Sequence, residues 1–168
     1  IEKLAKRGDP NKYELPKPIF YKGGCNLSFA GLKTAVLKIS KKIKTDQERF
    51  DLAASFQKTI EKILYKKSEI AFDEFSKINK SKKQKFVVAG GVAANKNIRE
   101  ILENLCKKKE FDSIFPPINL CGDNGAMIAM VGLERFKSKK FSELDHPAKP
   151  RWALDENAVF LKGSGIKL

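Results

Sequence analysis

Residues 85–102, KFVVAGGVAANKNIREIL, constrain the fold of this chain more than any other stretch. An apolar run leads into a pair of glycines, and an amphipathic stretch follows that Asn95 can cap. This order predicts a strand, a glycine turn and a helix. The pattern recurs where DSIFPP, residues 112–117, precedes NGAMIAMVGLERF, residues 124–136, which has the composition of a buried helix. Strands that alternate with helices predict an α/β fold.

The first half of the chain is predicted to be mainly helical. Residues 1–8 have the pattern of a helix end, and NLSF, residues 26–29, has the character of a short strand. Residues 31–43 show helical spacing. Asp46 is a candidate N-cap for a long helix. Its apolar stripe contains Phe50, Ala53, Phe56, Ile60, Ile63, Ile70 and Phe75.

The composition limits the class of protein. With 168 residues, 42% of them hydrophobic, the chain is long enough for one compact domain or for half of a two-lobed one. Cys25, Cys106 and Cys121 form no C-x-x-C pair, which argues against a disulfide framework and a cysteine zinc site and indicates a reducing, cytoplasmic setting. No apolar run approaches the roughly 18 to 20 residues of a membrane span, so no membrane association is expected.

The formal net charge of +14 has two interpretations. Clustered Lys and Arg side chains gain affinity for nucleic acids by displacing counterions from phosphates. However, most of the basic residues are lysines in clusters such as KKIK and KSKKQK, which a lysine-rich genome also produces. Aromatic residues do not interleave with these clusters, so a stacking groove for single strands is not indicated. Charge alone leaves a nucleic-acid partner open.

The two glycine-containing turns hold the candidate site residues. Gly90 and Gly91 would let a ligand approach the backbone, and the helix after them would offer free N–H groups to an anion or a ribose. A simple tight turn explains the same glycines. Asp123, in CGDNGAM, is a candidate metal ligand, a contact to a bound ligand or a helix cap. Ligands of open α/β sheets bind at such turns, but the pattern of either turn leaves these alternatives open.

Four motifs occur together and in order: LSFAGLKTAVL, VVAGGVAANKNIRE, FPPINLCGDNGAMIAMVGLERF and AKPRWALD. Through them, the chain from residue 1 to about residue 155 resembles the C-terminal part of the bacterial TsaD family, which makes threonylcarbamoyladenosine in tRNA. The resemblance implies an α/β lobe of the two-lobed actin, Hsp70 and sugar-kinase class (ASKHA fold), with a long helical insertion. Residues 1–155 would form this C-terminal lobe and residues 156–168 a C-terminal tail.

The resemblance also implies a reaction and its site. Family members transfer the threonylcarbamoyl group from its adenylate to the adenosine beside the anticodon, in tRNAs that read codons beginning with A. Asp123 would be a catalytic ligand of one divalent metal ion, iron or zinc, that acts as a Lewis acid. Asn95, with Gly90 and Gly91 beside it, would bind threonylcarbamoyl-AMP or ATP. The implied partners are tRNA, a related dimerising subunit and a small ATPase.

The sequence departs from the family in its metal ligands. The family supplies two histidines as H-x-x-x-H in its N-terminal half, whereas this chain has only His146, interpreted as a surface residue of a proline-flanked tail. A catalytic metal usually has about three protein ligands. Asp123 therefore cannot complete such a site within this chain, and the chain alone is expected to be inactive. Gly122 also stands where the family usually has threonine.

Three functions stay open at this point. The first is the C-terminal lobe of a threonylcarbamoyl transferase that acts together with its other half. The second is a catalytically silent scaffold of the same fold, and the third is a basic tRNA-binding module. We also expect exposed apolar area on the long helices, and with it self-association of the chain.

Overall fold

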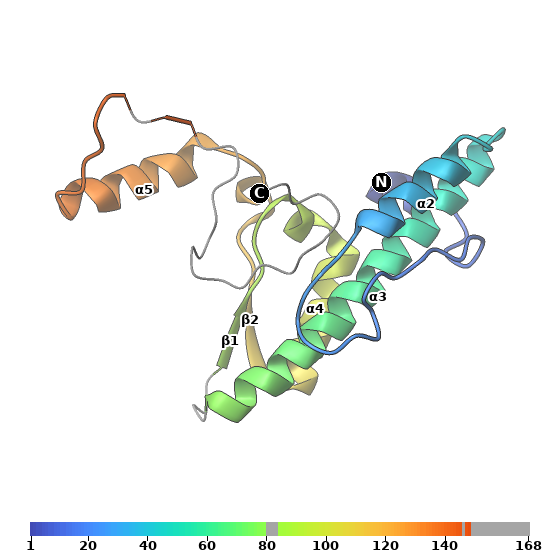
Figure 1. Cartoon of the computed structure of the whole chain (residues 1–168), viewed down its shortest axis with the longest axis horizontal. Coiled ribbons are helices and arrows are strands. Elements are labelled where there is room, and N and C mark those ends of the chain that lie inside the picture. Colours follow the sequence, from blue (N-terminus) through green and yellow to red (C-terminus); the bar gives the residue numbers. More distant parts are fainter. Residues whose placement is uncertain (80–83, 146, 149–168) are drawn as a thin grey trace. The chain divides into compact units, whose positions relative to one another are not determined.

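The computed structural model describes residues 1–79, 84–145 and 147–148, and Figure 1 shows their course. The chain divides into two compact units, residues 1–127 and residues 128–168. The predicted boundary between residues 155 and 156 lies outside the described residues. The elements are α1 (Glu2–Ala5), α2 (Ala30–Ser40), α3 (Asp46–Ile78), β1 (Gln84–Val87), the 3-10 turn η1 (Gly91–Ala94), α4 (Lys96–Lys108), β2 (Phe111–Ile114), the 3-10 turn η2 (Ile118–Leu120) and α5 (Gly125–Lys137).

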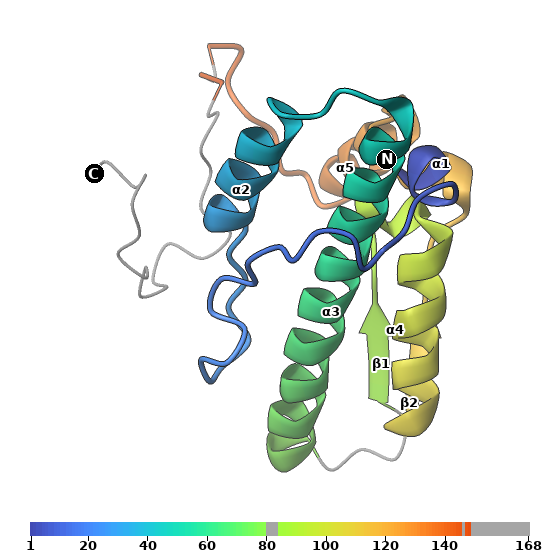
Figure 2. The same ribbon diagram turned by 90° about the vertical axis from the view of Figure 1, so that its right-hand side faces the viewer.

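A parallel βαβ unit confirms the predicted α/β class. β1 and β2 pair in parallel, with Gln84 opposite Phe111 and Val87 opposite Ile114, and α4 connects them. Figures 1 and 2 show α3 and α4 side by side over one face of this pair. Within the described residues the sheet has these two strands. The strands and helices expected around the two glycine-containing turns are therefore present.

Aromatic side chains fill the space between the helices and the strands. The Phe72 ring of α3 stacks on the Phe111 ring of β2, with 4.1 Å between centroids, and meets the Phe86 ring of β1 edge-on at 4.7 Å. Leu105 and Cys106 of α4 are fully buried beside them. We call these five residues the aromatic cluster. It holds α3, α4 and both strands together by apolar packing.

The N-terminal half of α3 packs against α2 and against the segment that precedes α2. Leu15, Leu32, Leu52 and Ile63 form a second buried cluster there, which we call the leucine cluster. Partly buried side chains surround it: Tyr13, Phe20, Ala35, Val36, Ile39, Ile43, Phe56 and Ile60. α3 thus spans two cores, one toward each of its ends.

α3 also buries polar side chains, which the apolar stripe did not predict. Asp51, Ser55 and Lys67 are each at least 93% buried; we call them the polar face of α3. Their hydrogen bonds run from Asp9 N to Asp51 Oδ1 (2.8 Å), from Tyr13 N to Ser55 Oγ (3.1 Å), and from Lys67 Nζ to the carbonyl oxygens of Lys22 (2.6 Å) and Gly24 (3.1 Å). The irregular segment 9–24 belongs to no strand or helix, and these side chains satisfy four of its backbone groups.

Gly8 lets this segment approach α3 closely. A Cβ on Gly8 would lie 2.1 Å from the carbonyl oxygen of Phe50, a separation that real structures essentially never show. The neighbouring Arg7 guanidinium lies over the Phe50 ring, 4.1 Å from its centroid. The first contact of the irregular segment with α3 therefore requires glycine.

The N-cap of α3 differs from the prediction. Thr45, rather than Asp46, caps the helix: its hydroxyl accepts a hydrogen bond from Glu48 N, and the Glu48 carboxylate accepts from Thr45 N at 3.1 Å and Lys44 N at 2.8 Å. These two N–H donors hold the pKa of Glu48 below its usual value. The capping box satisfies several N–H groups at once, which places Asp46 one residue inside the helix.

The short strand expected at residues 26–29 is not formed. These residues lie in an irregular stretch before α2, and no described segment pairs with them. A strand needs a neighbour to bond its N–H and C=O groups, so strand-like composition alone was insufficient. Of the predicted α3 stripe, Phe50 and Ile63 are buried, whereas Phe75 is 39% exposed.

Apolar side chains are exposed on the long helices, as predicted. Leu37 of α2 and Phe75 and Ile78 of α3 are each more than a third accessible. Among the described helices, none combines the length and the apolar character that crossing a bilayer requires. The expected self-association stays a prediction.

Candidate functional site

The glycine turn, residues 90–95, requires its first glycine for conformational reasons. Gly90 has φ +89° and ψ 172°, a region that essentially glycine alone occupies. A Cβ on Gly90 or on Gly91 would meet no atom within 4 Å. The structure thus leaves open space beside both glycines, which is compatible with the predicted approach of a ligand.

Asn95 caps α4, as predicted. Its Oδ1 accepts a hydrogen bond from Ile98 N at 3.1 Å, and its Nδ2 donates to Gln57 Oε1 on α3 at 3.0 Å. The N–H of Lys96 donates to a carboxylate oxygen of Glu2 at 3.4 Å. The expectation of free N–H groups at this helix start is therefore wrong for Ile98 and Lys96, because side chains already satisfy them.

One pocket brings two of the predicted substrate-binding residues together. Gly91 and Asn95 line a pocket of about 350 Å³ with Phe56, Gln57 and Ile60 of α3. Gly90 and Asp123 are not among its lining residues. Apolar walls with a few polar groups are the usual chemistry of small-molecule sites. The side-chain amides of Gln57 and Asn95, set among apolar side chains, could bind a flat ring that has polar groups on its edge.

Asp123 lies in a second loop, and it is not the cap of α5. Asn124 takes that role: its Oδ1 accepts from Met127 N at 3.0 Å, while its Nδ2 donates to Gly122 O at 2.9 Å. Asp123 is exposed and has no hydrogen bond or ion pair to any described residue. The cap alternative is thus wrong, and the carboxylate stays available to a metal or a ligand.

The helix after Asp123 is exposed rather than buried. None of the residues of α5 is buried, although Met127, Ile128, Met130 and Val131 are apolar. In the described part of the second unit no other helix or strand is present to cover it. The apolar composition was recognised from the sequence, but burial also requires a packing partner.

The described residues do not assemble a complete metal site. Across residues 1–79, 84–145 and 147–148, no three His, Cys, Asp or Glu side chains gather closely enough to hold an ion. Asp123 can offer one carboxylate group as a ligand, and the predicted surface residue His146 lies outside the described residues. The expectation that further ligands come from elsewhere stays a prediction.

Arg99 is the site residue that the sequence analysis missed. Its Nε donates to the carbonyl oxygen of Ala93 in the glycine turn. Its Nη2 donates to Pro116 O at 2.7 Å and to Cys121 Sγ at 3.1 Å, both in the loop of residues 115–124, which we call the aspartate loop. Arg99 follows Asn95 by four residues and so shares its side of α4. That spacing was the available signal.

Two of the cysteines are unsuited to nucleophilic chemistry. Desolvation and the Glu74 carboxylate, which accepts a hydrogen bond from Cys25 Sγ at 3.2 Å, raise the pKa of Cys25. Burial, with a smaller contribution from Glu103, raises the pKa of Cys106. A thiol must ionise to act as a nucleophile, so neither side chain is activated.

Comparison with known proteins places these two loops in a family. The sequence model described as TsaD, tRNA N6-adenosine threonylcarbamoyltransferase, matches residues 1–130, which include Gly90, Gly91, Asn95 and Asp123. The chain belongs to the TsaD family. Family membership assigns the βαβ unit and the long α3 to the ASKHA fold, as predicted.

Curated TsaD proteins are similar along the chain. A tRNA N6-adenosine threonylcarbamoyltransferase of Pelagibacter ubique (strain HTCC1062) is 79% identical over 168 residues, which are 100% of this chain and 47% of that relative. A protein of the same name from Rickettsia massiliae (strain Mtu5) is 49% identical over 159 residues, which are 93% of this chain and 46% of the relative. The chain thus spans about half the length of these relatives.

Proposed function

We propose that this chain supplies the C-terminal lobe of a tRNA threonylcarbamoyltransferase. In the intact protein, the threonylcarbamoyl group would pass from threonylcarbamoyl-AMP to the adenosine beside the anticodon. The observation that carries this proposal is the TsaD match across residues 1–130, which spans both loops that hold the candidate residues. The names of the relatives from Pelagibacter and Rickettsia support the same reaction.

The pocket beside the glycine turn is proposed to hold the nucleoside part of the adenylate. Asn95 uses one of its two amide hydrogens for Gln57 and one oxygen lone pair for Ile98 N. One donor and one acceptor site remain on the side chain. Asn95 can therefore cap α4 and contact a ligand at the same time, with Gly90 and Gly91 leaving room for it.

Asp123 is proposed as the ligand that this chain gives to one divalent metal ion, iron or zinc. The support is a carboxylate that neither caps α5 nor pairs with any described residue. Such an ion would supply Lewis-acid chemistry when bound. The alternative is a silent scaffold of the same fold.

The decisive experiment compares Asp123→Asn with Asp112→Asn in the intact protein. Both changes remove one exposed carboxylate, but Asp112 lies on the strand β2. We expect Asp123→Asn to abolish tRNA modification and lower the metal content, while Asp112→Asn leaves both unchanged. Full modification by Asp123→Asn with normal metal content would contradict the ligand assignment and favour the scaffold.

Asn95→Ser separates ligand binding from helix capping. Serine is also a good N-cap, so α4 should stay folded while the amide is lost. We expect weaker binding of the adenylate with unchanged metal content. Asn97→Ser is the matched control, because Asn97 is an exposed asparagine on the same helix and does not line the pocket. Equal losses of adenylate and metal in Asn95→Ser would indicate misfolding instead.

The proposed partners follow from the family. tRNA is the proposed macromolecular substrate, and a related dimerising subunit and a small ATPase are the proposed protein partners, in the cytoplasm. Between residues 30 and 45 five lysines are exposed and no residue is acidic, so this segment is a candidate tRNA contact: Lys33, Lys38, Lys41, Lys42 and Lys44. Binding of tRNA should therefore weaken steeply as the salt concentration rises.

A further inference from the structure

Arg99 joins the two loops that carry the candidate residues. One guanidinium contacts the glycine turn through Ala93 O and the aspartate loop through Pro116 O and Cys121 Sγ. The same group lies 4.9 Å from the centre of the Phe115 ring. Asn95 stands two residues after Ala93, and Asp123 two residues after Cys121. Each contact is therefore close in sequence to a residue that the proposed function uses.

Arg99 contacts a buried residue in each of the two loops. Ala93 and Cys121 are 1% and 3% exposed. The Cys121 thiol also lies 3.5 Å from Pro117 O and 3.7 Å from Pro116 O. A buried thiol with three polar neighbours cannot move without breaking their contacts. The Arg99 guanidinium therefore bonds a buried group in each loop, not a mobile surface group.

We propose that Arg99 is a positioning residue, which fixes the glycine turn relative to the aspartate loop so that Asn95 and Asp123 act on one substrate. The inference rests on the proposed function. The two loops follow the paired ends of β1 and β2, where Val88 N donates to Ile114 O. Neither loop contains a strand, so beyond that bond no strand pairing connects them. A planar guanidinium with several N–H donors in a fixed geometry can bond both loops at once.

The chemistry of the side chain predicts which replacements fail. Methionine fills a similar volume but has no donor, so both loops lose their common partner. Lysine keeps the charge but presents a compact ammonium, which cannot reproduce the planar fork and its stacking on Phe115. The Arg99→Lys variant should therefore fold normally but have reduced activity. A role limited to charge would be rescued by lysine.

The test uses the intact protein with its partners, carrying Arg99→Lys, Arg99→Met or the control Arg49→Met. Arg49 is an exposed arginine whose side chain pairs only with the neighbouring Asp46 on α3 among the described residues. We expect kcat for tRNA modification to fall about 10- to 100-fold in both Arg99 variants, the range for supports of a site's ligands. Arg49→Met should stay near the parent rate, and melting temperatures identify any variant that fails to fold.

Hydrogen exchange provides a readout that does not depend on activity. We expect Arg99→Lys to speed amide exchange in both residues 90–95 and residues 115–122, while residues 46–78 keep their protection. Faster exchange in one loop alone, or in neither, would overturn the proposal. A parent protein that modifies no tRNA would refute the proposed function but leave this measurement valid, so the two failures are distinguishable.

A double-mutant cycle tests the coupling directly. If Arg99 places Asn95 for the adenylate, the affinity lost through Asn95→Ser should be smaller in an Arg99→Lys background than in the parent. Additive losses, together with an unchanged kcat in Arg99→Lys, would show that Arg99 only stabilises the fold. Arg49→Met in place of Arg99→Lys should give additive losses.

Discussion

The two halves of the first unit are stabilised in different ways. Around β1, β2 and α4, regular elements satisfy their own backbone groups, and the aromatic cluster supplies the packing. Around residues 9–24 the chain is irregular, and the polar face of α3 bonds its backbone. The comparison shows that α3 packs through apolar side chains toward both ends, and that in the irregular half its polar face also supplies partners for the backbone.

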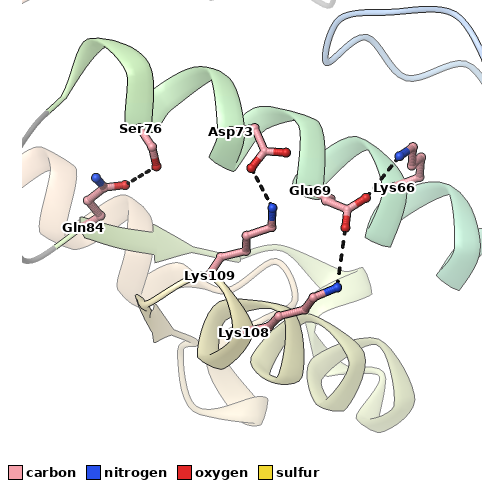
Figure 3. A network of polar contacts seen from close by, with 7 residues as sticks. All are labelled: Lys66, Glu69, Asp73, Ser76, Gln84, Lys108 and Lys109. Atoms are coloured by element: carbon pink, nitrogen blue, oxygen red, sulfur yellow. Dashed lines mark hydrogen bonds and ion pairs between the residues drawn. The ribbon is translucent and has the colours of Figure 1, made fainter.

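Ion pairs surround the aromatic cluster but contribute less. Figure 3 shows Lys109 bonded to Asp73, Glu69 between two lysines, and Ser76 bonded to Gln84. The distance from Lys109 Nζ to Asp73 Oδ1 is 2.7 Å. These groups are partly or mostly accessible, and exposed pairs of this kind stabilise proteins only weakly. The strength of this half therefore comes from its core.

Removal of the central aromatic ring should have the largest effect. Phe72→Ala is expected to cost about 3–5 kcal/mol, the usual range for a buried phenylalanine. Hydrogen exchange should accelerate in residues 84–87 and 105–114 and stay unchanged in residues 9–24. Phe75→Ala is the control, because Phe75 is 39% exposed. Equal acceleration of both halves would show that they unfold together.

Loss of the buried ammonium should affect the other half. Lys67→Met keeps most of the side-chain volume but leaves the carbonyl oxygens of Lys22 and Gly24 without their donor. The expected cost is about 1–3 kcal/mol for each carbonyl that stays buried. Exchange should accelerate in residues 18–27 while residues 84–114 keep their protection. Exposed Lys62 on the same helix provides the matched Lys62→Met control.

The cap of α3 should matter less than either core. Thr45→Ala removes the hydroxyl that accepts from Glu48 N, which is worth about 1 kcal/mol at a typical N-cap. Only the first turn of α3 should lose protection. Thr34→Ala removes a comparable hydroxyl from the middle of α2 and should cost less. A larger loss for Thr34→Ala would contradict the capping assignment.

Lowering the pH should have the smallest effect on stability of the changes considered. The N–H of Asp9, followed by the Gln47 amide, holds the pKa of Asp51 below its usual value, and the Lys109 ammonium does the same for Asp73. Lowered carboxyl pKa values stabilise the fold above a pH of about 4, the pKa range of an unfolded aspartate, and this stability is lost on further acidification. Melting temperatures between pH 5 and pH 2.5 should fall less steeply in Asp51→Asn than in the parent. An unchanged slope would contradict the assignment.

Sequence patterns predicted the regular half of the molecule better than the irregular half. The period of the apolar residues and the glycine turn predicted β1, α4, β2 and the Asn95 cap, because each depends on near neighbours. The strand at residues 26–29 and the burial of α5 were wrong, since both need a partner elsewhere in the chain. The buried Lys67 was missed for the same reason.

The candidate site divides in the same way. By itself the sequence determined the family and predicted Asn95 and Asp123, in two loops, as candidate site residues, because motifs are local in the chain. Only the tertiary structure decided that Asn124 rather than Asp123 caps α5, that Gln57 bonds Asn95, and that Arg99 bonds both loops. These contacts depend on distances in space. Side-chain packing sets those distances, and the spacing of residues in the sequence does not reveal them.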